Sequence, residues 1–215
     1  MKITDLRPQK RSSRRVSVFI DGRYAFGMDQ ELALQLQLRV GSELDAARVQ
    51  QIIVEVEHKK ALDASFKLLS FRRRSRKELA DRLQRKEFNS GAIAATIQKL
   101  AALGLLDDTK FAEALARDRL ELGHKGKRQI YADLRRKGIP KLEIERALER
   151  AGDETEVART LLAKVARRYA GLAPRERYRK LHDLLLRRGF SFDAVRRVLA
   201  EEEKRAATAE IARDE

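Results

Sequence analysis

The sequence predicts a mainly α-helical protein with three tandem copies of a three-helix repeat, of period 51, in an elongated body behind an N-terminal β-hairpin. Three observations lead to this prediction. Apolar residues recur at a fixed interval of 51 residues, strand signals are confined to the first 30 residues, and the remaining segments show apolar spacings of three and four.

The repeat is visible as five sets of three apolar residues. In each set the members are 51 residues apart: Leu79, Ile130 and Leu181; Leu83, Leu134 and Leu185; Phe88, Ile139 and Phe190; Ile93, Ile144 and Val195; Ile97, Leu148 and Leu199. Within one repeat the first two positions are one helical turn apart, and so are the last two, with a polar or helix-breaking patch between them. Each repeat therefore contains a helix, a tight turn and a second helix.

A further apolar periodic segment precedes each helix pair, which makes each repeat three helices long. The predicted repeats span residues 61–106, 107–152 and 153–203. A unit of about 45 residues buries too little apolar surface by itself, so the repeats are expected to stack on one another. Stacking in a row makes the body elongated.

The segments outside the repeats have different characters. Residues 1–15 hold six cations and one anion and predict a flexible basic arm. Residues 16–60 begin with alternating apolar residues on both sides of Asp21-Gly22, a pair that favours a two-residue hairpin turn. Helices follow, with Asp29 as a predicted N-cap. Residues 204–215 form a charged tail that we expect to extend the last helix.

The composition limits the classes of protein and partner. A net charge of +15 over 215 residues indicates either an anionic partner or a role in solubility, and the usual partners are nucleic acid, an anionic membrane or an acidic protein surface. The chain contains no cysteine, which excludes disulfides and thiolate metal sites. No run of about 18 apolar residues is present, so no membrane span is expected. Without a secretory signal, a cytoplasmic location is expected.

Basic residues concentrate at equivalent places in the repeats. Residues 71–88 hold eight cations and three anions, and residues 164–188 hold nine and two, whereas residues 16–65 hold five cations and eight anions. Repeats that stack would align these groups along one edge, facing phosphates or an acidic groove. The candidate contacts are Arg72, Arg73, Arg74, Arg76, Lys77, Arg85, Lys86, Lys127, Arg128, Arg135, Arg136, Lys137, Arg177, Arg179, Arg187 and Arg188.

Two explanations of these cations stay open. Those that end the second helix of each repeat also stabilise the negative end of the helix dipole, by roughly 0.3–1 kcal/mol each, without any partner. The cations that precede the second helix are not explained in this way. An anionic track explains both groups.

The sequence lacks the residue patterns of an enzyme. No nucleophile stands near a histidine, and no phosphate-binding glycine loop is present, so no catalytic residue and no cofactor are expected. Three widely separated histidines do not predict a metal site. Asp107-Asp108 precedes a periodic apolar segment, which favours an N-cap over a metal ligand. Aromatic residues make up 6% of the chain, so base stacking is not expected to be a strong mode of binding.

Three segments resemble the RecX family, the regulators of the RecA recombinase: LLSFRRRSRKELADRLQRKEF, LGLLDDTKFAEALARDRL and RQIYADLRRKGI. The strongest matches are Ser75 with Glu78-Leu79, residues 103–108, Phe111-Ala112 and residues 136–139. They cover residues 61–150, and the third repeat and the hairpin resemble the longer family members more loosely. The chain departs from the family pattern at Arg73, where proline is frequent, and at Glu87, where glycine is usual.

The resemblance implies a curved, cationic body that binds in the helical groove of a RecA–DNA filament. It implies inhibition of the ATPase, coprotease and strand-exchange activities of RecA, with phosphate contacts to single- and double-stranded DNA. We expect a monomer with no enzymatic activity. Bridging of RecA subunits, capping of filament ends and blocking of strand entry stay open as mechanisms. The alternative is a RecA-independent, helix-turn-helix-like DNA-binding protein, which three-helix units and the high charge support equally.

Overall fold

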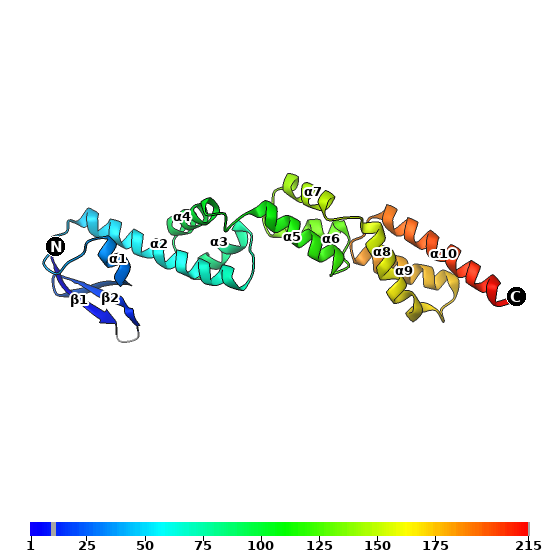
Figure 1. The fold of residues 1–215 in the computed structure, drawn as a ribbon, viewed down its shortest axis with the longest axis horizontal. Helices are drawn as coiled ribbons and strands as arrows, with labels where there is room; N and C mark the ends of the chain where they lie inside the picture. The colour runs from blue at the N-terminus through cyan, green and yellow to red at the C-terminus, as the bar shows by residue number, and fades with distance from the viewer. Residues whose placement is uncertain (10–11, 215) are drawn as a thin grey trace. The chain divides into compact units, whose positions relative to one another are not determined.

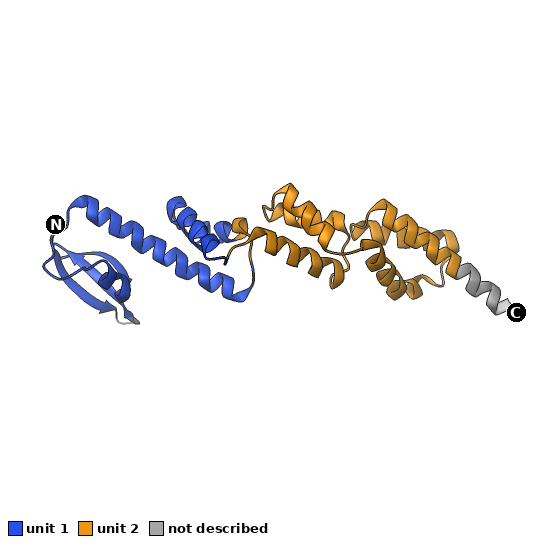
Figure 2. Ribbon diagram, turned by 45° about the horizontal axis from the view of Figure 1, so that its top comes forward, with its two compact units in different colours: residues 1–73, 79–105 blue, residues 74–78, 106–215 orange. Residues whose placement is uncertain are grey.

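The computed structural model describes residues 1–9 and 12–214, with side chains for residues 1–9 and 14–205. Its residues group into two compact units (Figure 2). Unit 1 comprises Met1–Arg73 and Leu79–Leu105, and unit 2 comprises Arg74–Glu78 and Leu106–Glu215. The elongated, curved shape of the chain stays a prediction.

Unit 1 begins with a three-stranded antiparallel sheet in the order β1-β2-β3 (Figure 1). The strands are β1 (Ile3–Gln9), β2 (Ser12–Ile20) and β3 (Arg23–Asp29). The predicted hairpin is confirmed as β2 and β3. Asp21 and Gly22 have φ angles of 47° and 78°, which are the two positive values that a type I′ turn requires.

The predicted flexible arm at residues 1–15 is wrong for the residues that the structure describes. Ile3 to Gln9 pair with β2 as an edge strand, and Ile3 is fully buried. Pro8 lies on this edge strand, where a missing backbone donor is tolerated. Lys10 and Arg11, also assigned to the arm, lie outside the described residues. In the sequence, the cations that follow Leu6 separate Ile3 and Leu6 from the next apolar strand residue, Val16, and so hid the strand pattern.

One face of the sheet packs against two helices, α1 (Gln30–Gln35) and the first half of α2 (Ala46–Phe71). Asp29 is the N-cap residue of α1, although its side chain makes no capping hydrogen bond. The buried residues of this core are Ile3, Val16, Val18, Met28, Ala33, Leu38, Ile52 and Val56.

The helix α2 runs without a break through the predicted boundary between residues 60 and 61, so this boundary stays a prediction. No glycine or proline lies between Ala46 and Phe71, so nothing in this stretch ends the helix. Its start is fixed by Asp45, whose carboxylate accepts a hydrogen bond from the Arg48 backbone N–H at 2.6 Å. The same helix therefore supports the sheet and serves as the first helix of repeat 1.

The rest of the chain confirms a mainly helical fold built from three-helix repeats (Figure 1). Repeat 1 continues with α3 (Arg76–Gln84) and α4 (Ser90–Ala102). Repeat 2 consists of α5 (Asp108–Glu121), α6 (Lys127–Arg136) and α7 (Lys141–Arg150). Repeat 3 consists of α8 (Glu154–Val165) with a 3₁₀ turn at Ala166–Tyr169, α9 (Pro174–Arg187) and α10 (Phe192–Asp214).

The periodic apolar positions form the repeat cores. All five positions are buried in repeats 2 and 3, from Ile130 to Leu148 and from Leu181 to Leu199. In repeat 1 the last three positions are only half-buried. There α4 turns a neighbouring face inward, and that face carries Ala92, Thr96 and Leu100. The expected equivalence of the third helices is therefore shifted by one residue in repeat 1, where α4 packs against the long α2.

The charged tail continues α10, as expected from the sequence. Two acids that precede it pair within repeat 3. The Glu201 carboxylate accepts hydrogen bonds from Arg159 at 2.8 and 3.0 Å, and the Glu202 carboxylate accepts one from Arg177 at 2.6 Å. These contacts join α10 to α8 and α9.

Candidate anion-binding surface

The turn before α3 is a capping box that also contacts repeat 2. The Ser75 hydroxyl accepts a hydrogen bond from the Glu78 N–H at 3.1 Å, and the Glu78 carboxylate accepts one from the Ser75 N–H at 3.3 Å. The same hydroxyl donates to the Lys137 carbonyl at 2.7 Å. We call this contact between residues 75–77 and residues 137–138 the first junction.

An equivalent contact joins repeat 2 to repeat 3. The Gly126 N–H donates to the Arg188 carbonyl at 2.8 Å, and the Arg128 N–H donates to the Gly189 carbonyl at 3.0 Å. We call this contact between residues 126–128 and residues 188–189 the second junction. Gly126 is 51 residues after Ser75, and Arg188 is 51 residues after Lys137, so both junctions use the same positions of the repeat. In each, the start of one α-helix receives the turn that ends a helix of the next repeat.

The turns at these junctions explain where glycine is required. Glu87, Gly138 and Gly189 occupy one position, with φ angles of 65°, 80° and 83°. A Cβ atom at Gly138 would lie 2.7 Å from the Lys77 side chain, and one at Gly189 would lie 2.6 Å from the Gln129 backbone nitrogen. No preceding repeat meets the turn at Glu87. Glu87, which stands where the family usually has glycine, adopts the same positive φ as Gly138 and Gly189. The turn therefore keeps its form in repeat 1.

His124 adds a third contact to the second junction. Its Nε2 lies 3.0 Å from the Lys164 ammonium on α8, and the Arg188 guanidinium donates to the Gly123 carbonyl at 3.2 Å. Burial, reinforced by the charges of Lys164 and Arg188, lowers the pKa of His124. The imidazole is therefore kept neutral beside two cations.

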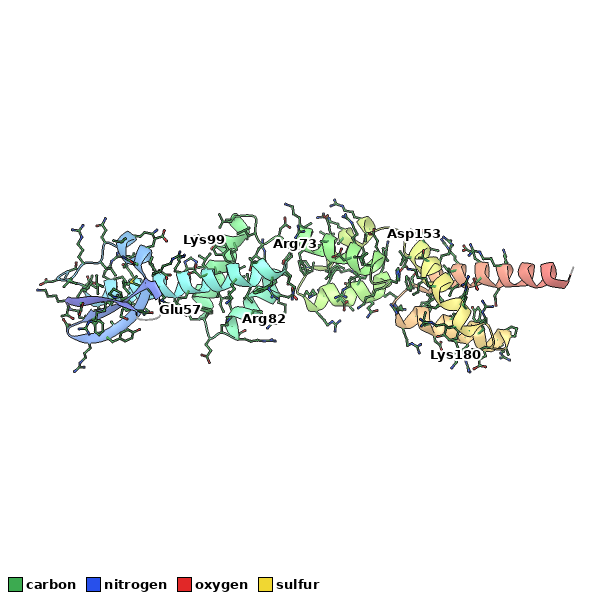
Figure 3. The ribbon with its side chains drawn as sticks, turned by 60° about the horizontal axis from the view of Figure 1, so that its bottom comes forward. Glu57, Arg73, Arg82, Lys99, Asp153 and Lys180 are labelled. Atoms are coloured by element: carbon green, nitrogen blue, oxygen red, sulfur yellow. The ribbon has the colours of Figure 1, made fainter. Side chains whose placement is uncertain are left out.

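The junctions bring ten of the candidate cations to two places in unit 2. Within or next to the first junction are Arg74, Arg76, Lys77, Arg135, Arg136 and Lys137, and within or next to the second are Lys127, Arg128, Arg187 and Arg188. The helix α6 joins the two junctions, and its ten residues span about 15 Å. Two further candidates, Arg177 and Arg179, lie on α9 in unit 2, while Arg72, Arg73, Arg85 and Lys86 belong to unit 1. Figure 3 labels Arg73 and, near Arg179 on α9, Lys180.

Several candidates are engaged in contacts within the fold. The Lys137 ammonium lies 2.5 Å from the Glu78 carboxylate and 5.8 Å from the centre of the Phe111 ring. Arg177 is half-buried and pairs with Glu202. Arg136 pairs with the buried carboxylate of Asp133. These three side chains form ion pairs within the fold, and this role alone can explain their presence without a contact to a partner.

The buried carboxylate of Asp133 forms ion pairs with two cations. It pairs with Arg136 and lies 3.4 Å from the Lys125 ammonium. Burial favours the neutral form of Asp133, but the hydrogen bonds and charges of Arg136 and Lys125 outweigh it and lower the pKa. The carboxylate therefore stays ionised and ties the turn before α6 to the end of that helix.

A second group of candidates is exposed. The structure records neither an ion pair nor a hydrogen bond for these side chains within the described part of the chain. The group consists of Arg73, Arg76, Arg85, Lys86, Arg135, Arg179 and Arg187. Such side chains keep their hydration and rotamer freedom until an anion binds. They are the strongest candidates for contact with phosphates or acidic side chains.

Phe192 is a surface residue that the sequence analysis did not single out. Its side chain is 64% exposed at the start of α10, and the Arg128 guanidinium lies 5.2 Å above its ring. The signal in the sequence was an aromatic residue after Phe190 in a turn where the other repeats have Ser90 or Lys141. An exposed ring amid cations suits a partner with a flat or apolar group.

The described residues contain neither a cluster of metal ligands nor a membrane-spanning helix. Among the described residues, no group of three or more histidine or acidic side chains is placed to hold a metal ion. Asp107 is an N-cap, as expected, since its carboxylate accepts a hydrogen bond from the Lys110 N–H at 3.0 Å, which lowers its pKa. The described helices include none that is long and apolar enough to span a membrane.

The fold and this surface define a tandem three-helix repeat protein that carries an N-terminal sheet and presents cations where its repeats meet. Models of the RecX family match it in four places. The N-terminal domain of regulatory protein RecX matches residues 1–45, and the first, second and third three-helix domains of RecX match residues 61–100, 107–148 and 152–199.

Whole-chain comparisons agree with these matches. The regulatory protein RecX of Levilactobacillus brevis is 35% identical over 92% of this chain and 75% of its own length, and that of Bacillus subtilis is 32% identical over 90% and 74%. A crystal structure of regulatory protein RecX superposes with a TM-score of 0.73 at 28% identity, covering 92% of this chain and 98% of that one. RecX from Lactobacillus salivarius gives 0.63 at 32% identity over 67% and 96%. The chain belongs to the RecX family of regulatory proteins.

Proposed function

We propose that this chain is a negative modulator of the RecA recombinase that binds in the groove of a RecA–DNA filament. In this proposal it inhibits ATPase, coprotease and strand-exchange activity in the cytoplasm, as a monomer and without catalysis of its own. Family membership supports the regulatory role. The observation that supports a RecA–DNA filament as the partner is that the same junction geometry occurs twice, each time beside an exposed cation such as Arg135 or Arg187.

The repetition matters because the partner is itself repetitive. A nucleoprotein filament offers phosphates and acidic side chains at regular intervals, and a chain with cations at regular intervals can contact several of them at once. Arg76 and Arg135 mark the first junction and Arg187 marks the second, separated by the length of α6. Engagement of consecutive sites on the filament would restrain the subunit motions that accompany ATP hydrolysis.

The test is a titration of the chain into RecA on single-stranded DNA while ATP turnover is followed. The variant Arg76→Gln/Arg135→Gln/Arg187→Gln removes three exposed cations for which the structure records no intramolecular partner. The matched control, Arg39→Gln/Lys60→Gln/Lys67→Gln, removes the same charge from exposed positions of unit 1 outside the candidate set. We expect half-inhibition to need roughly tenfold more of the first variant and an unchanged amount of the control. Equal inhibition by both variants would contradict the proposal.

The alternative, a DNA-binding protein that acts without RecA, predicts a different result in a retention experiment. RecA filaments are immobilised on single-stranded DNA and exposed to the chain in the presence of excess competitor DNA. A modulator of the filament stays bound, whereas a protein that recognises DNA alone is removed by the competitor. Loss of retention would favour the alternative.

A further inference from the structure

The sheet of unit 1 has a second face that takes no part in its core. Along β2, Val16 and Val18 point toward the helices, and the residues between them, Ser17 and Phe19, belong to the other face. Neither Phe19 nor its cross-strand neighbour Tyr24 is a member of the core cluster. Tyr24 is 60% exposed. An aromatic surface is thus presented outward by the sheet.

Three flat groups lie side by side on this face. The rings of Phe19 and Tyr24 are 6.0 Å apart in an edge-to-face arrangement, and the guanidinium of Arg7 lies 4.8 Å from the centre of the Phe19 ring. Asp5 is paired with Phe19 in the register, and its carboxylate lies 2.5 Å from Arg7 Nε. This ion pair orients the guanidinium over the ring, while the Arg7 side chain stays 67% exposed.

Hydrogen bonds hold the surface in this form. The Thr4 hydroxyl donates to the Phe19 carbonyl at 3.3 Å and accepts from the Gly22 N–H at 3.0 Å. The Lys2 N–H donates to the Asp21 carboxylate at 2.8 Å. The turn between β2 and β3 is therefore tied to β1, and the aromatic groups need little ordering when a ligand binds.

The charge around the face favours an anionic ligand. Residues 1–9 and 14–29, whose side chains the structure describes, contain five cations and three anions, and one of these anions, Asp5, is already paired with Arg7. This part of the sheet also carries polar side chains, since the Gln9 amide donates to the Ser17 hydroxyl at 3.4 Å, so the face is not a continuous apolar patch. Stacking rings combined with cations are the means by which sheets bind single-stranded nucleic acids.

We propose that the outward face of the β1-β2-β3 sheet binds single-stranded nucleic acid, with bases stacked on Tyr24 and Phe19 and phosphates held by Arg7 and neighbouring cations. This proposal rests on the proposed function, in which the partner contains single-stranded DNA. It adds stacking of bases to the phosphate contacts proposed for the junctions. It differs from the expectation that stacking plays no strong part, because the fold collects scarce aromatic residues on one surface.

The absence of tryptophan from the chain allows a direct test. In the Tyr24→Trp variant the indole is the only one in the protein and lies at the proposed stacking position. Oligothymidylate is expected to quench its fluorescence, and an abasic oligonucleotide of equal length and charge is expected to leave it unchanged. The control Phe66→Trp places the indole on α2, ten residues beyond Val56 of the sheet core, and should respond to neither.

Affinity measurements on the full chain complete the test. Loss of the ring in Tyr24→Leu is expected to weaken binding of oligothymidylate by about fivefold to a hundredfold, as measured by fluorescence anisotropy, with little change for the abasic polymer. Arg7→Lys keeps the charge but not the flat group and should show a smaller loss in the same direction.

Three outcomes would overturn the stacking site. They are binding of oligothymidylate without quenching at position 24, equal quenching by the abasic polymer, and quenching only by RecA protein, which would identify the face as a protein contact. None of these readouts involves RecA inhibition. A failure here is therefore distinct from a failure of the proposed function.

Discussion

At the residue scale, one backbone position distinguishes the first repeat from the other two. Glu87 adopts the same left-handed conformation as Gly138 and Gly189, a conformation that costs a non-glycine residue roughly 1–2 kcal/mol. Glu87→Gly is therefore expected to stabilise the chain by about 0.5–1 kcal/mol, after allowance for the greater freedom of glycine in the unfolded state.

Thermal unfolding followed by circular dichroism measures this effect, and hydrogen exchange of α3 and α4 locates it. The comparison variant is Gly138→Ala, at the equivalent position of repeat 2. It combines the unfavourable φ with a contact to Lys77 and should destabilise the chain by more than Glu87→Gly stabilises it. A Glu87→Gly variant with a lower melting temperature would refute the account of this turn.

The buried carboxylate of Asp133 carries a prediction about pH. Since its pKa is lower in the folded chain than the unfolded value of about 3.9, its ionised form stabilises the fold above that value. This contribution is lost as the pH falls through the folded pKa. Asp133→Asn is expected to cost about 1–3 kcal/mol at pH 7, because Lys125 and Arg136 lose their partner.

Urea unfolding from pH 7 to pH 3 measures the difference between Asp133→Asn and the unaltered chain. The gap should begin to narrow below about pH 4, where the unfolded chain binds a proton at Asp133 that the folded chain does not, and it should close once the pH is below the folded pKa. Asp193→Asn is a suitable control, because that carboxylate also pairs with an arginine, Arg196, but is 76% exposed. A gap that stays constant across the titration would show that the ion pairs are not its source.

At the element scale, the second junction is predicted to hold repeat 3 against repeat 2. A methyl group at Gly126 would overlap backbone atoms of Gly189 and Phe190. Gly126→Ala should therefore separate the turn at residues 188–189 from the start of α6 and speed hydrogen exchange at the Gly126 and Arg128 amides. The control Gly171→Ala introduces the same methyl group where nothing lies within 4 Å. Equal exchange in the two variants would contradict the role of this junction.

The sequence predicted the elements whose signals are local, and it missed those that depend on tertiary contact. The 51-residue apolar period, the Asp21-Gly22 turn and the caps at Ser75 and Asp107 are local patterns, and each corresponds to an observed feature. β1 was missed because charged residues and a proline interrupt its alternation, while its partner strand supplies the pairing.

The candidate surface shows the same division. The concentration of cations could be counted in the sequence, but the contacts that gather them join residues 62 positions apart, such as Ser75 with Lys137 and Gly126 with Arg188. Only the folded chain separates Lys137 and Arg177, which pair with acids, from Arg135 and Arg187, which face solvent. Charge pattern alone carries no information on which cations already have partners.

At the scale of the whole molecule, the contacts proposed for the two units differ in their chemistry. Unit 2 presents cations at its junctions, which suit phosphates, and unit 1 presents rings on its sheet, which suit bases. Ionic contacts release counterions when they form, so their strength depends on salt, whereas stacking depends on it weakly. The salt dependence of binding to single-stranded DNA therefore distinguishes the two contributions.

We expect the logarithm of the affinity for oligothymidylate to fall linearly with the logarithm of salt concentration. Each lost phosphate contact should reduce the slope by about 0.7, so Arg76→Gln/Arg135→Gln/Arg187→Gln should reduce it by up to about 2. Tyr24→Leu should lower the affinity equally at every salt concentration and keep the slope. Anisotropy titrations between 50 and 300 mM salt, roughly the range over which such contacts weaken strongly, measure both quantities. The reverse assignment, a flatter slope for Tyr24→Leu and an unchanged slope for the triple variant, would place the phosphate contacts on the sheet rather than at the junctions.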